Sequence, residues 1–454
     1  MRKLKYTIRM FTTLIAVILF MSCNNDDDAI DKLAIYSASI NGTDFSNELS
    51  NIPLNGTIEI AFSHVLNPDT FNQALSLSDP QGEANYTAIL GNANSKAIVS
   101  YSGLNLGSSY TISVDQGAIG ENGESLNTGF SKSFATTSEV EEKKTPCTSA
   151  SEECIQNIEI SEGLTFEFYS SFDIISDADF VWEDIEEVVF AVHGQNRDAN
   201  EYFRYMTHSV GDIGKLESTL VISPYFKDEA NASNGELFWD TNWREGATSA
   251  NTEADISSFT VLDKIVEYLT DSEKFPNLKK IKFAGHSSGA ALIQHYAIVN
   301  TSESNYPDYK FQYIVANNQY FYYPDGRRYN ENTNDFYTPT DCTGYDFWPY
   351  GYETAPAYVD GMTQEDLLQQ QISRTTIYLL GTDDTETEGT LNTTDCAAVL
   401  LGSNRLERGR NIFNYFETFY AAENNQETIE VPNVGHDANA MFNSDAFKDI
   451  LNRE

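Results

Sequence analysis

The chain has 454 residues, of which 41% are hydrophobic, so it can bury a large core and is expected to form two or three domains. Its 26 Tyr and 27 Phe residues argue against a disordered chain. The formal net charge is −40 at pH 7, and so acidic a surface repels nucleic acid and anionic lipid headgroups. We therefore expect no nucleic-acid partner.

The N-terminus has the pattern of an export signal. Basic residues within 1–9 precede an apolar run at 10–20 that is too short to span a bilayer comfortably. A small residue then precedes Cys23, and this arrangement resembles a bacterial lipobox, in which the cysteine becomes the lipidated first residue. Phe20 stands where Leu is commoner in that motif. The polar, acidic run at 24–28 resembles the surface-export signal of Bacteroidetes lipoproteins.

These resemblances imply a signal peptide at 1–22 and a polar tether at 23–32. They also imply a lipid on Cys23 that anchors the protein in a membrane, at the outer membrane or the cell surface. A plain cleaved signal peptide followed by an incidental cysteine is the alternative interpretation.

Export makes the remaining cysteines candidates for disulfide bonds. The sequence holds five cysteines, and the four beyond the N-terminal one allow three pairings. A local bond between Cys147 and Cys154 would leave Cys342 and Cys396 to staple the C-terminal half of the chain. There is no CxxC motif and no His-rich cluster, so a structural zinc site is not expected.

Residues 33–137 are predicted to form a small β-sandwich. Short runs of alternating apolar and polar residues are broken by Gly, Asn and Pro, as in sandwiches of about this length. The details resemble a bacterial Ig-like family, in which the module mostly acts as a spacer. The segments that carry this resemblance are 57–63, 106–112, 120–126 and 134–137.

A charged linker at 138–150 separates the sandwich from a second domain, expected at 151–454. In that domain strand-like runs alternate with amphipathic helices, which predicts an α/β fold with a mostly parallel sheet and helices on both faces. The expected strands are 165–169, 187–192, 219–223, 280–284, 313–316 and 376–380. A stretch at about 320–370 is rich in Tyr, Asn and Pro and shows little periodicity.

The sequence Gly-His-Ser-Ser-Gly at 285–289 lies between an expected strand and an expected helix at 290–296. Gly-x-Ser-x-Gly is short enough to arise by chance, so the elements around it must show whether it forms a nucleophile turn. A strand before it and a helix after it are what a sharp nucleophile turn requires, and the two glycines let the turn close. The helix N-terminus adds positive dipole where negative charge develops in the reaction. We predict that Ser287 is a nucleophile; a serine in a non-catalytic Gly-rich turn is the alternative.

A serine nucleophile needs a base and an acid that orients the base. His436 follows an expected strand at 428–431 and precedes the last helix, so we predict that it is the base. The acid should follow the strand that lies between the serine and the histidine. Two adjacent carboxylates do so, and the Gly-x-x-Asp spacing from Gly381 favours Asp384, with Asp383 as the alternative.

Two backbone N–H groups are expected to hold the oxyanion of the reaction. One should belong to Ser288, directly after the nucleophile. The other should come from the loop after the strand at 187–192, where His193 and Gly194 follow a buried strand. We predict the N–H of Gln195 for this role, with Gly194 letting the loop approach; an ordinary turn is the alternative.

Together these residues resemble the α/β-hydrolase superfamily, and in particular its esterases, over about 155–454. A more specific resemblance exists to a little-characterised branch of that superfamily in fungi and bacteria. It is carried by 341–351, 391–398 and 402–409. With this resemblance, a bridge between Cys342 and Cys396 would pin the cap region of the domain against the acid loop.

Several aromatic residues fall in loops expected above the sheet. They could stack on a sugar or aryl ring of a substrate, or they could form the core of the cap region. These residues are Trp239, Trp243, Trp348, Tyr320, Phe321, Tyr322 and Tyr323.

The sequence therefore predicts a secreted, lipid-anchored serine hydrolase that uses no metal and no cofactor. Its expected substrates are esters attached to or derived from polysaccharides, such as acyl or feruloyl esters, or a polyester. A serine peptidase with the same three residues is one alternative. A non-catalytic, glycan-binding surface lipoprotein is the other.

Overall fold

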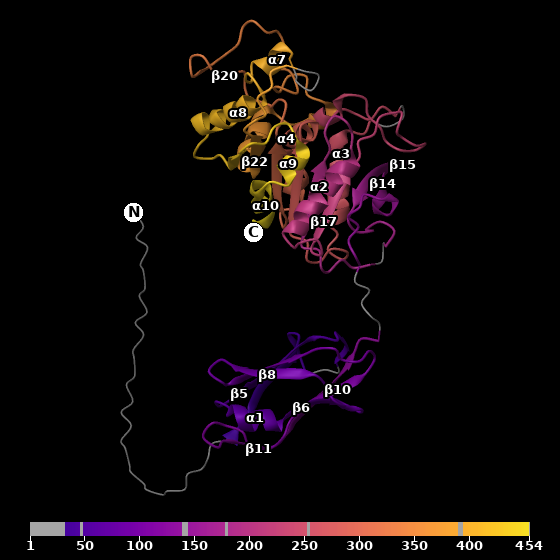
Figure 1. The fold of residues 1–454 in the computed structure, drawn as a ribbon, viewed down its shortest axis with the longest axis vertical. Coiled ribbons are helices and arrows are strands. Elements are labelled where there is room, and N and C mark those ends of the chain that lie inside the picture. Colours follow the sequence, from indigo (N-terminus) through magenta and orange to yellow (C-terminus); the bar gives the residue numbers. More distant parts are fainter. Residues whose placement is uncertain are drawn as a thin grey trace, which may run out of the picture. The chain divides into compact units, whose positions relative to one another are not determined.

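The structure is a computed structural model that describes residues 32–45, 49–138, 144–177, 180–251, 255–388 and 394–453. Two compact units make up the chain, Met1–Lys143 and Lys144–Glu454 (Figure 1). The expected signal peptide, most of the tether and the anchor residue Cys23 lie outside the described residues. In the part of the chain that is described, no helix is long and apolar enough to cross a membrane.

The N-terminal unit is a sandwich of two five-stranded sheets. The first sheet has the strand order β4 (Leu49–Ile52), β13 (Phe130–Thr136), β10 (Ser109–Val114), β6 (Leu75–Asp79) and β7 (Gly82–Glu83). The second has the order β3 (Thr43–Asp44), β2 (Ile35–Ile40), β5 (Gly56–Phe62), β9 (Lys96–Tyr101) and β8 (Tyr86–Gly91). A small sheet and one helix complete the unit: β1 (Lys32–Leu33), β12 (Ser125–Leu126), β11 (Gly117–Ala118) and α1 (Pro68–Ala74).

The alternating sequence of these strands builds the sandwich core. Ile58 and Ile60 of β5 are fully buried, while Glu59 between them is partly exposed. On β10 of the facing sheet, Ile112 and Val114 are buried in the same cluster. Because successive side chains of a strand point to opposite faces, every second residue enters the core. The predicted sandwich is confirmed.

The C-terminal unit is built on one eight-stranded sheet. Its order is β14 (Ile155–Ser161), β15 (Leu164–Ser170), β17 (Thr219–Pro224), β16 (Glu187–Val192), β18 (Lys280–His286), β19 (Lys310–Ala316), β22 (Thr376–Gly381) and β23 (Gln426–Val431). The strands from β17 to β23 are mutually parallel, whereas β14 and β15 form an antiparallel edge. The prediction of a mostly parallel sheet is confirmed, and the edge strand β14 was not foreseen.

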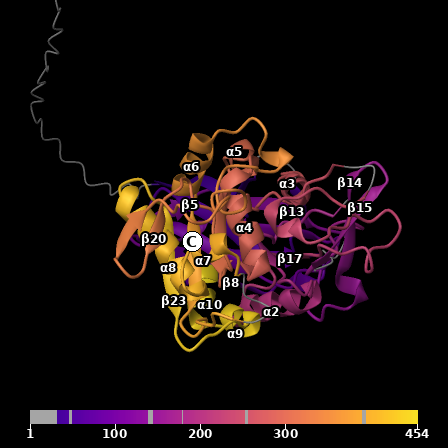
Figure 2. The same cartoon turned by 90° about the horizontal axis from the view of Figure 1, so that it is seen from above.

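Helices cover both faces of this sheet (Figure 2). One hydrophobic cluster joins the sheet to α3 (Ser258–Leu269), α4 (Ser288–Val299), α6 (Gln364–Ser373) and α8 (Arg405–Phe419). A second cluster joins the other face to α2 (Ala199–Asp212), α9 (Ala438–Phe442) and α10 (Asp445–Asn452). The shorter elements are α5 (Ser302–Asn305), α7 (Cys396–Val399), β20 (Arg328–Asn330), β21 (Asp335–Tyr337) and the 3₁₀ helices η1 (Glu152–Cys154), η2 (Asn242–Glu245) and η3 (Ala357–Val359).

The central strand β16 shows why both faces must be covered. Val188, Phe190 and Val192 lie in the first cluster, and Val189 and Ala191 lie in the second. All are fully buried. A strand that is apolar on both sides is stable only between two layers of helices, so its sequence already implies this three-layer arrangement.

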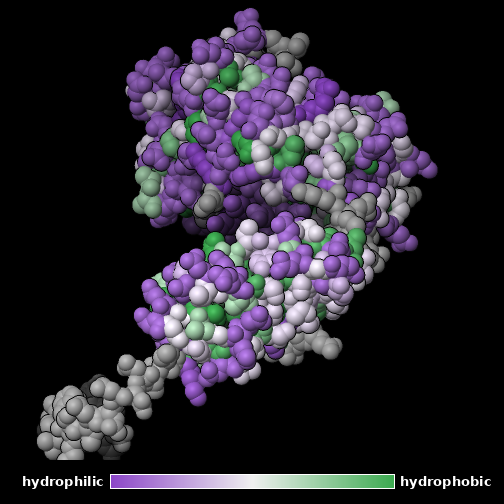
Figure 3. Space-filling view, turned by 60° about the horizontal axis from the view of Figure 1, so that its bottom comes forward, coloured by the Kyte–Doolittle hydropathy of each residue, from purple (hydrophilic) through white to green (hydrophobic). Residues whose placement is uncertain are grey.

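On the face shown in Figure 3, hydrophilic residues predominate and hydrophobic ones are scattered. Among the described residues, the large hydrophobic side chains that are exposed come from separate places in the sequence: Tyr36, Ile89, Leu106, Val181, Tyr337, Phe347, Val399 and Phe419.

Two disulfide bonds join the four cysteines of the described chain. Cys147 is bonded to Cys154 near the start of the C-terminal unit, with Cα atoms 5.6 Å apart. Cys342, in the segment between β19 and β22, is bonded to Cys396 at the start of α7, with Cα atoms 6.0 Å apart. Of the three possible pairings, the structure has the local one together with the long-range staple.

Removing the long-range disulfide should destabilise the C-terminal unit. Cys342 and Cys396 are 54 positions apart, so replacing both by serine should lower the free energy of unfolding by about 2–4 kcal/mol. The matched pair Cys147→Ser and Cys154→Ser opens a loop of only 7 positions and should cost less, because loop entropy grows with length. Thermal unfolding without reductant measures both. A larger loss from the short loop would contradict this expectation.

Candidate active site

A sharp turn joins β18 to α4 and places Ser287 between them. Ser287 has φ 58° and ψ −118°, a backbone conformation that non-glycine residues rarely adopt. Its backbone N–H donates a hydrogen bond of 3.1 Å to the carbonyl of Ala316, the last residue of β19. The strained residue is therefore held by the neighbouring strand.

The two glycines of the turn are required by close packing. A Cβ atom on Gly285 would lie 2.3 Å from the carbonyl oxygen of Gly289. A Cβ atom on Gly289 would lie 2.2 Å from the carbonyl oxygen of Val192, at the end of β16. Both distances are far below van der Waals contact, so only glycine allows this turn to pack against the neighbouring strand.

The structure brings Ser287, His436 and Asp384 into one chain of hydrogen bonds. Nε2 of His436 lies 2.9 Å from Oγ of Ser287, and its Nδ1 lies 2.9 Å from Oδ2 of Asp384. The three residues follow β18, β23 and β22 at the same edge of the sheet. The alternative acid, Asp383, is exposed and accepts a hydrogen bond from Thr382 instead.

A buried arginine holds the second oxygen of Asp384. Nε and Nη2 of Arg405, the first residue of α8, lie 2.7 and 2.6 Å from Oδ1 of Asp384, and both side chains are 1% exposed. Burial by itself would raise the pKa of Asp384, but hydrogen bonds from His436 and Arg405 lower it below its usual value. The carboxylate therefore stays ionised beside the imidazole. Sequence analysis assigned no role to Arg405.

A second histidine packs against His436. The ring of His286 lies 4.7 Å from that of His436, centroid to centroid, and it is almost fully buried. Burial, and then the neighbouring imidazole, lower the pKa of His286 well below its usual value. His286 is thus a neutral packing partner at neutral pH, and it adds no positive charge beside the proposed base.

Two amides after β19 complete the surroundings of the serine. Nε2 of Gln319 donates to Oγ of Ser287 at 3.2 Å. The side chain of Asn317 donates to the carbonyl of Gly435 at 2.8 Å and accepts from the N–H of Gly381 at 2.7 Å. Asn317 therefore ties the histidine loop to the acid strand. Sequence analysis missed both residues, although the carboxyl end of a parallel strand is where site residues gather.

The loop after β16 begins beside the nucleophile turn, because Val192 is paired with Gly285 across the sheet. The buried ring of His193 fixes this loop: its Nδ1 donates to the carbonyl of Gly194 at 2.8 Å, and its Nε2 accepts from the N–H of Phe226 at 3.1 Å. Burial lowers the pKa of His193 to about 4, so this ring is neutral.

A residue larger than glycine at position 194 would require the side chain of Tyr202 to shift. A Cβ atom there would lie 2.8 Å from the hydroxyl oxygen of Tyr202. The next residue, Gln195, is exposed, and Ser288 is the first residue of α4. The two residues predicted to hold an oxyanion therefore follow adjacent strands at the same edge of the sheet.

The aromatic residues above the sheet form a core. Six of the seven are buried, and only Trp348 is partly exposed. Its ring packs 4.8 Å from His295 and 5.8 Å from Tyr322. The cap-core interpretation therefore holds for the buried six, which are Trp239, Trp243, Tyr320, Phe321, Tyr322 and Tyr323.

Comparison with known proteins identifies the first unit. Residues 37–136 match the family model of the bacterial Ig-like domain. The N-terminal unit is a bacterial Ig-like domain. The C-terminal unit has the α/β-hydrolase fold, with its parallel sheet between two layers of helices. No curated protein sequence matches the chain.

Several solved structures are similar to this chain at low identity. The LpqC poly(3-hydroxybutyrate) depolymerase from Bordetella parapertussis is 17% identical with a TM-score of 0.46, over 63% of this chain and 87% of that chain. Poly(aspartic acid) hydrolase-1 from Sphingomonas sp. KT-1 is 15% identical with a TM-score of 0.45, over 63% and 94%. The siderophore hydrolase EstA from Aspergillus nidulans is 13% identical with a TM-score of 0.36, over 65% and 93%.

Removal of the buried cation should destabilise the C-terminal unit in a pH-dependent way. Arg405→Gln leaves the buried Asp384 without its cation, which should cost about 3 kcal/mol of unfolding free energy near neutral pH. The low folded-state pKa of Asp384 stabilises the wild type above the unfolded-state value, and this contribution disappears as pH falls through the folded-state value. The difference in unfolding free energy between the wild type and Arg405→Gln should therefore shrink on acidification. The reason is that Asp384 takes up its proton at a higher pH in the variant than in the wild type.

Denaturant unfolding between pH 3 and pH 8 measures this difference. Arg410→Gln is the matched control, because Arg410 lies on the same helix but pairs with Glu430 at the surface. That variant should lose less than about 1 kcal/mol. A loss of unfolding free energy in Arg405→Gln that stays constant with pH, or that equals the loss in Arg410→Gln, would count against Arg405 as the partner that keeps Asp384 ionised.

Proposed function

We propose that the C-terminal unit is a serine hydrolase that cleaves carboxylic esters. The proposal is carried by the unbroken hydrogen-bond chain from Oγ of Ser287 through His436 to Asp384. The strained backbone of Ser287 and the ionised state of Asp384 support it further. In this arrangement Ser287 is the nucleophile, His436 is the general base and Asp384 orients the imidazole.

In the first half of the reaction, Oγ of Ser287 attacks the ester carbonyl carbon. Its proton passes to Nε2 of His436, and the carbonyl oxygen becomes an oxyanion. The N–H groups of Ser288 and Gln195 are proposed to stabilise this charge, aided by the N-terminal dipole of α4. Asp384 stabilises the imidazolium by accepting the hydrogen bond from Nδ1.

The tetrahedral intermediate then breaks its bond to the alcohol oxygen, and Nε2 of His436 returns the proton to the leaving alcohol. Water attacks the resulting acyl-serine in the second half of the reaction. His436 takes a proton from this water and then returns it to Oγ of Ser287, which releases the carboxylic acid. Every proton transfer uses side chains of this chain, and none requires a metal or a cofactor.

The two disulfides and the Ig-like domain indicate a protein outside the cytoplasm. Within that setting we propose a lipid anchor on Cys23 at the outer membrane or cell surface, with the Ig-like domain as a spacer. The proposed substrates are esters attached to or derived from polysaccharides, or a polyester. A serine peptidase and a non-catalytic glycan-binding protein are the competing functions.

A fluorophosphonate probe tests for an activated serine. Wild-type protein should be labelled, and Ser287→Ala should abolish labelling because the nucleophilic oxygen is gone. Ser403→Ala is the control, since that serine is exposed and lies outside the hydrogen-bond chain of Ser287, His436 and Asp384. Absence of labelling in the wild type would favour the non-catalytic alternative, and labelling that survives Ser287→Ala would exclude this nucleophile.

Substrate panels separate the esterase from the peptidase. We expect faster turnover of aryl and alkyl esters than of the corresponding peptide anilides, with kcat/KM for both reduced by about 10⁴-fold or more in Ser287→Ala. A preference for the anilides would establish the peptidase instead.

The anchor is tested by fractionation. Cys23→Ala removes the thiol that would carry the lipid, so the full chain should move from the membrane fraction to the soluble fraction of the expressing cells. Ser22→Ala, which keeps the cysteine and still places a small residue before it, should stay with the membranes. Membrane retention of Cys23→Ala would refute lipidation at this position.

A further inference from the structure

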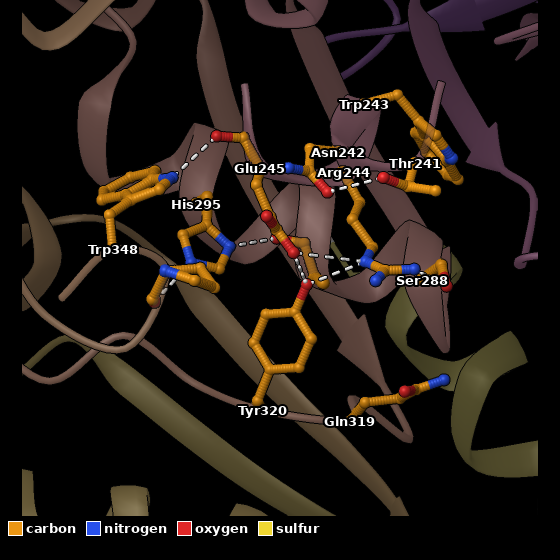
Figure 4. Close-up of polar contacts among 12 residues, drawn as sticks. Thr241, Asn242, Trp243, Arg244, Glu245, Ser288, His295, Gln319, Tyr320 and Trp348 are labelled. Carbon is orange, nitrogen blue, oxygen red and sulfur yellow. Dashed lines mark hydrogen bonds and ion pairs between the residues drawn. The ribbon is translucent and has the colours of Figure 1, made fainter. Parts of the chain in front are cut away.

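A second charged group lies beside the proposed nucleophile. Arg244, on the 3₁₀ helix η2, extends its guanidinium group toward the N-terminus of α4, where Nη1 lies 3.4 Å from Oγ of Ser288 (Figure 4). On its other side, Nε donates to the hydroxyl of Tyr320 at 2.9 Å. Ser288 follows the nucleophile in the chain, and Tyr320 follows Gln319, which contacts the nucleophile. The guanidinium of Arg244 thus contacts Ser288 and Tyr320, each of which directly follows a residue of the site in the chain.

The guanidinium is held in place mainly through Nε. The hydroxyl of Tyr320 accepts from Arg244 and donates to Glu245 at 2.6 Å, and Glu245 lies 3.4 Å from Nε of Arg244. The backbone carbonyl of Glu245 in turn accepts from Nε1 of Trp348 at 2.8 Å (Figure 4). These contacts fix the position of the side chain without using its far edge.

The far edge of the guanidinium is available to a ligand. Nη2 of Arg244 makes no hydrogen bond or ion pair with any residue that the structure describes, and Nη1 makes only the long contact to Ser288. The side chain is 21% exposed, so solvent or substrate can reach it. The buried Arg328, in contrast, uses both of its Nη atoms, which bond to backbone carbonyls and to Asp346.

We infer that Arg244 binds a carboxylate of the substrate, so that the enzyme prefers esters with a free acid group near the scissile bond. The inference rests on the proposed function of Ser287. Two parallel N–H donors of a guanidinium match the two oxygens of a carboxylate, and charge-assisted pairs of this kind are strong when partly desolvated. The N-terminus of α4 favours negative charge at the same place.

The pair disfavours a ligand with two negative charges. Glu245 lies 3.4 Å from Nε of Arg244 and compensates part of its charge. A bound monoanion gives the group of Arg244, Glu245 and ligand a net charge of −1, whereas a phosphate dianion gives −2, which is less favourable in a partly desolvated site. The net charge of −40 disfavours anions near the protein, so a local cation helps an acidic substrate to bind.

The experiment compares charged and neutral esters of similar size. Phenyl adipate monoester places a carboxylate on the acyl side, with phenyl 6-methylheptanoate as its neutral counterpart. The hexanoate ester of 4-hydroxybutyrate places the carboxylate on the alcohol side, with 4-methylpentyl hexanoate as its counterpart. The measured quantity is the ratio of kcat/KM between the charged and the neutral ester of each pair.

The wild type should favour the charged ester in one of the two pairs, and that pair identifies the side of the scissile bond on which the acid lies. Arg244→Gln should lower this ratio by about 10- to 100-fold, because a charge-assisted hydrogen-bonded pair is lost. Arg244→Lys should recover only part of it, since an ammonium lacks the planar fork. Arg410→Gln, which removes the same charge from the surface, should leave the ratio unchanged.

Two outcomes overturn the inference. A wild-type ratio near one in both pairs shows that no carboxylate is recognised. An Arg244→Gln variant that loses activity on charged and neutral esters equally shows that the arginine only positions the turn. Fluorophosphonate labelling of Ser287 is measured in the same preparations. If wild-type protein is not labelled and cleaves none of the esters, the proposed function itself fails, which is distinct from either outcome.

Discussion

The close contact between the nucleophile turn and β16 is the constraint on which the rest of the site depends. With 2.2 Å between the carbonyl oxygen of Val192 and the position of a Cβ on Gly289, the helix can start only if that Cβ is absent. This approach brings α4, the loop after β16 and Ser287 to one edge of the sheet. The acid and base loops reach the same edge because β22 and β23 run parallel to β18.

Charge is distributed very unevenly between the surface and the site. The sequence carries a large excess of acidic residues, yet the surroundings of Ser287 contain arginines from distant segments. Arg405 neutralises Asp384 and Arg244 is balanced by Glu245, so the described site gathers paired charges beside neutral histidines. Fixed pairs of this kind need little reorganisation when charge develops during a reaction, which is what electrostatic catalysis requires.

Local patterns in the sequence were enough to predict the sheet and to single out three residues that the structure joins in one hydrogen-bond chain. Continuous apolar runs mark the buried strands, and the glycines at 285 and 289 mark the turn, because each of these features depends on neighbours in the chain. The contacts of Arg405, Gln319 and Arg244 could not be predicted in this way. Their partners lie 21, 32 and 76 positions away, so only the folded chain brings them together.

The pairing of Arg405 with Asp384 also couples the acid to the order of a helix. Arg405 is the first residue of α8, and helix ends open more readily than helix interiors. Each opening of that first turn would leave a carboxylate buried without its cation, which makes the opening itself unfavourable. Amide hydrogen exchange in the first turn of α8 should therefore be slower than in a typical helix end. The ionisation of Asp384 and the opening of the first turn of α8 are therefore coupled.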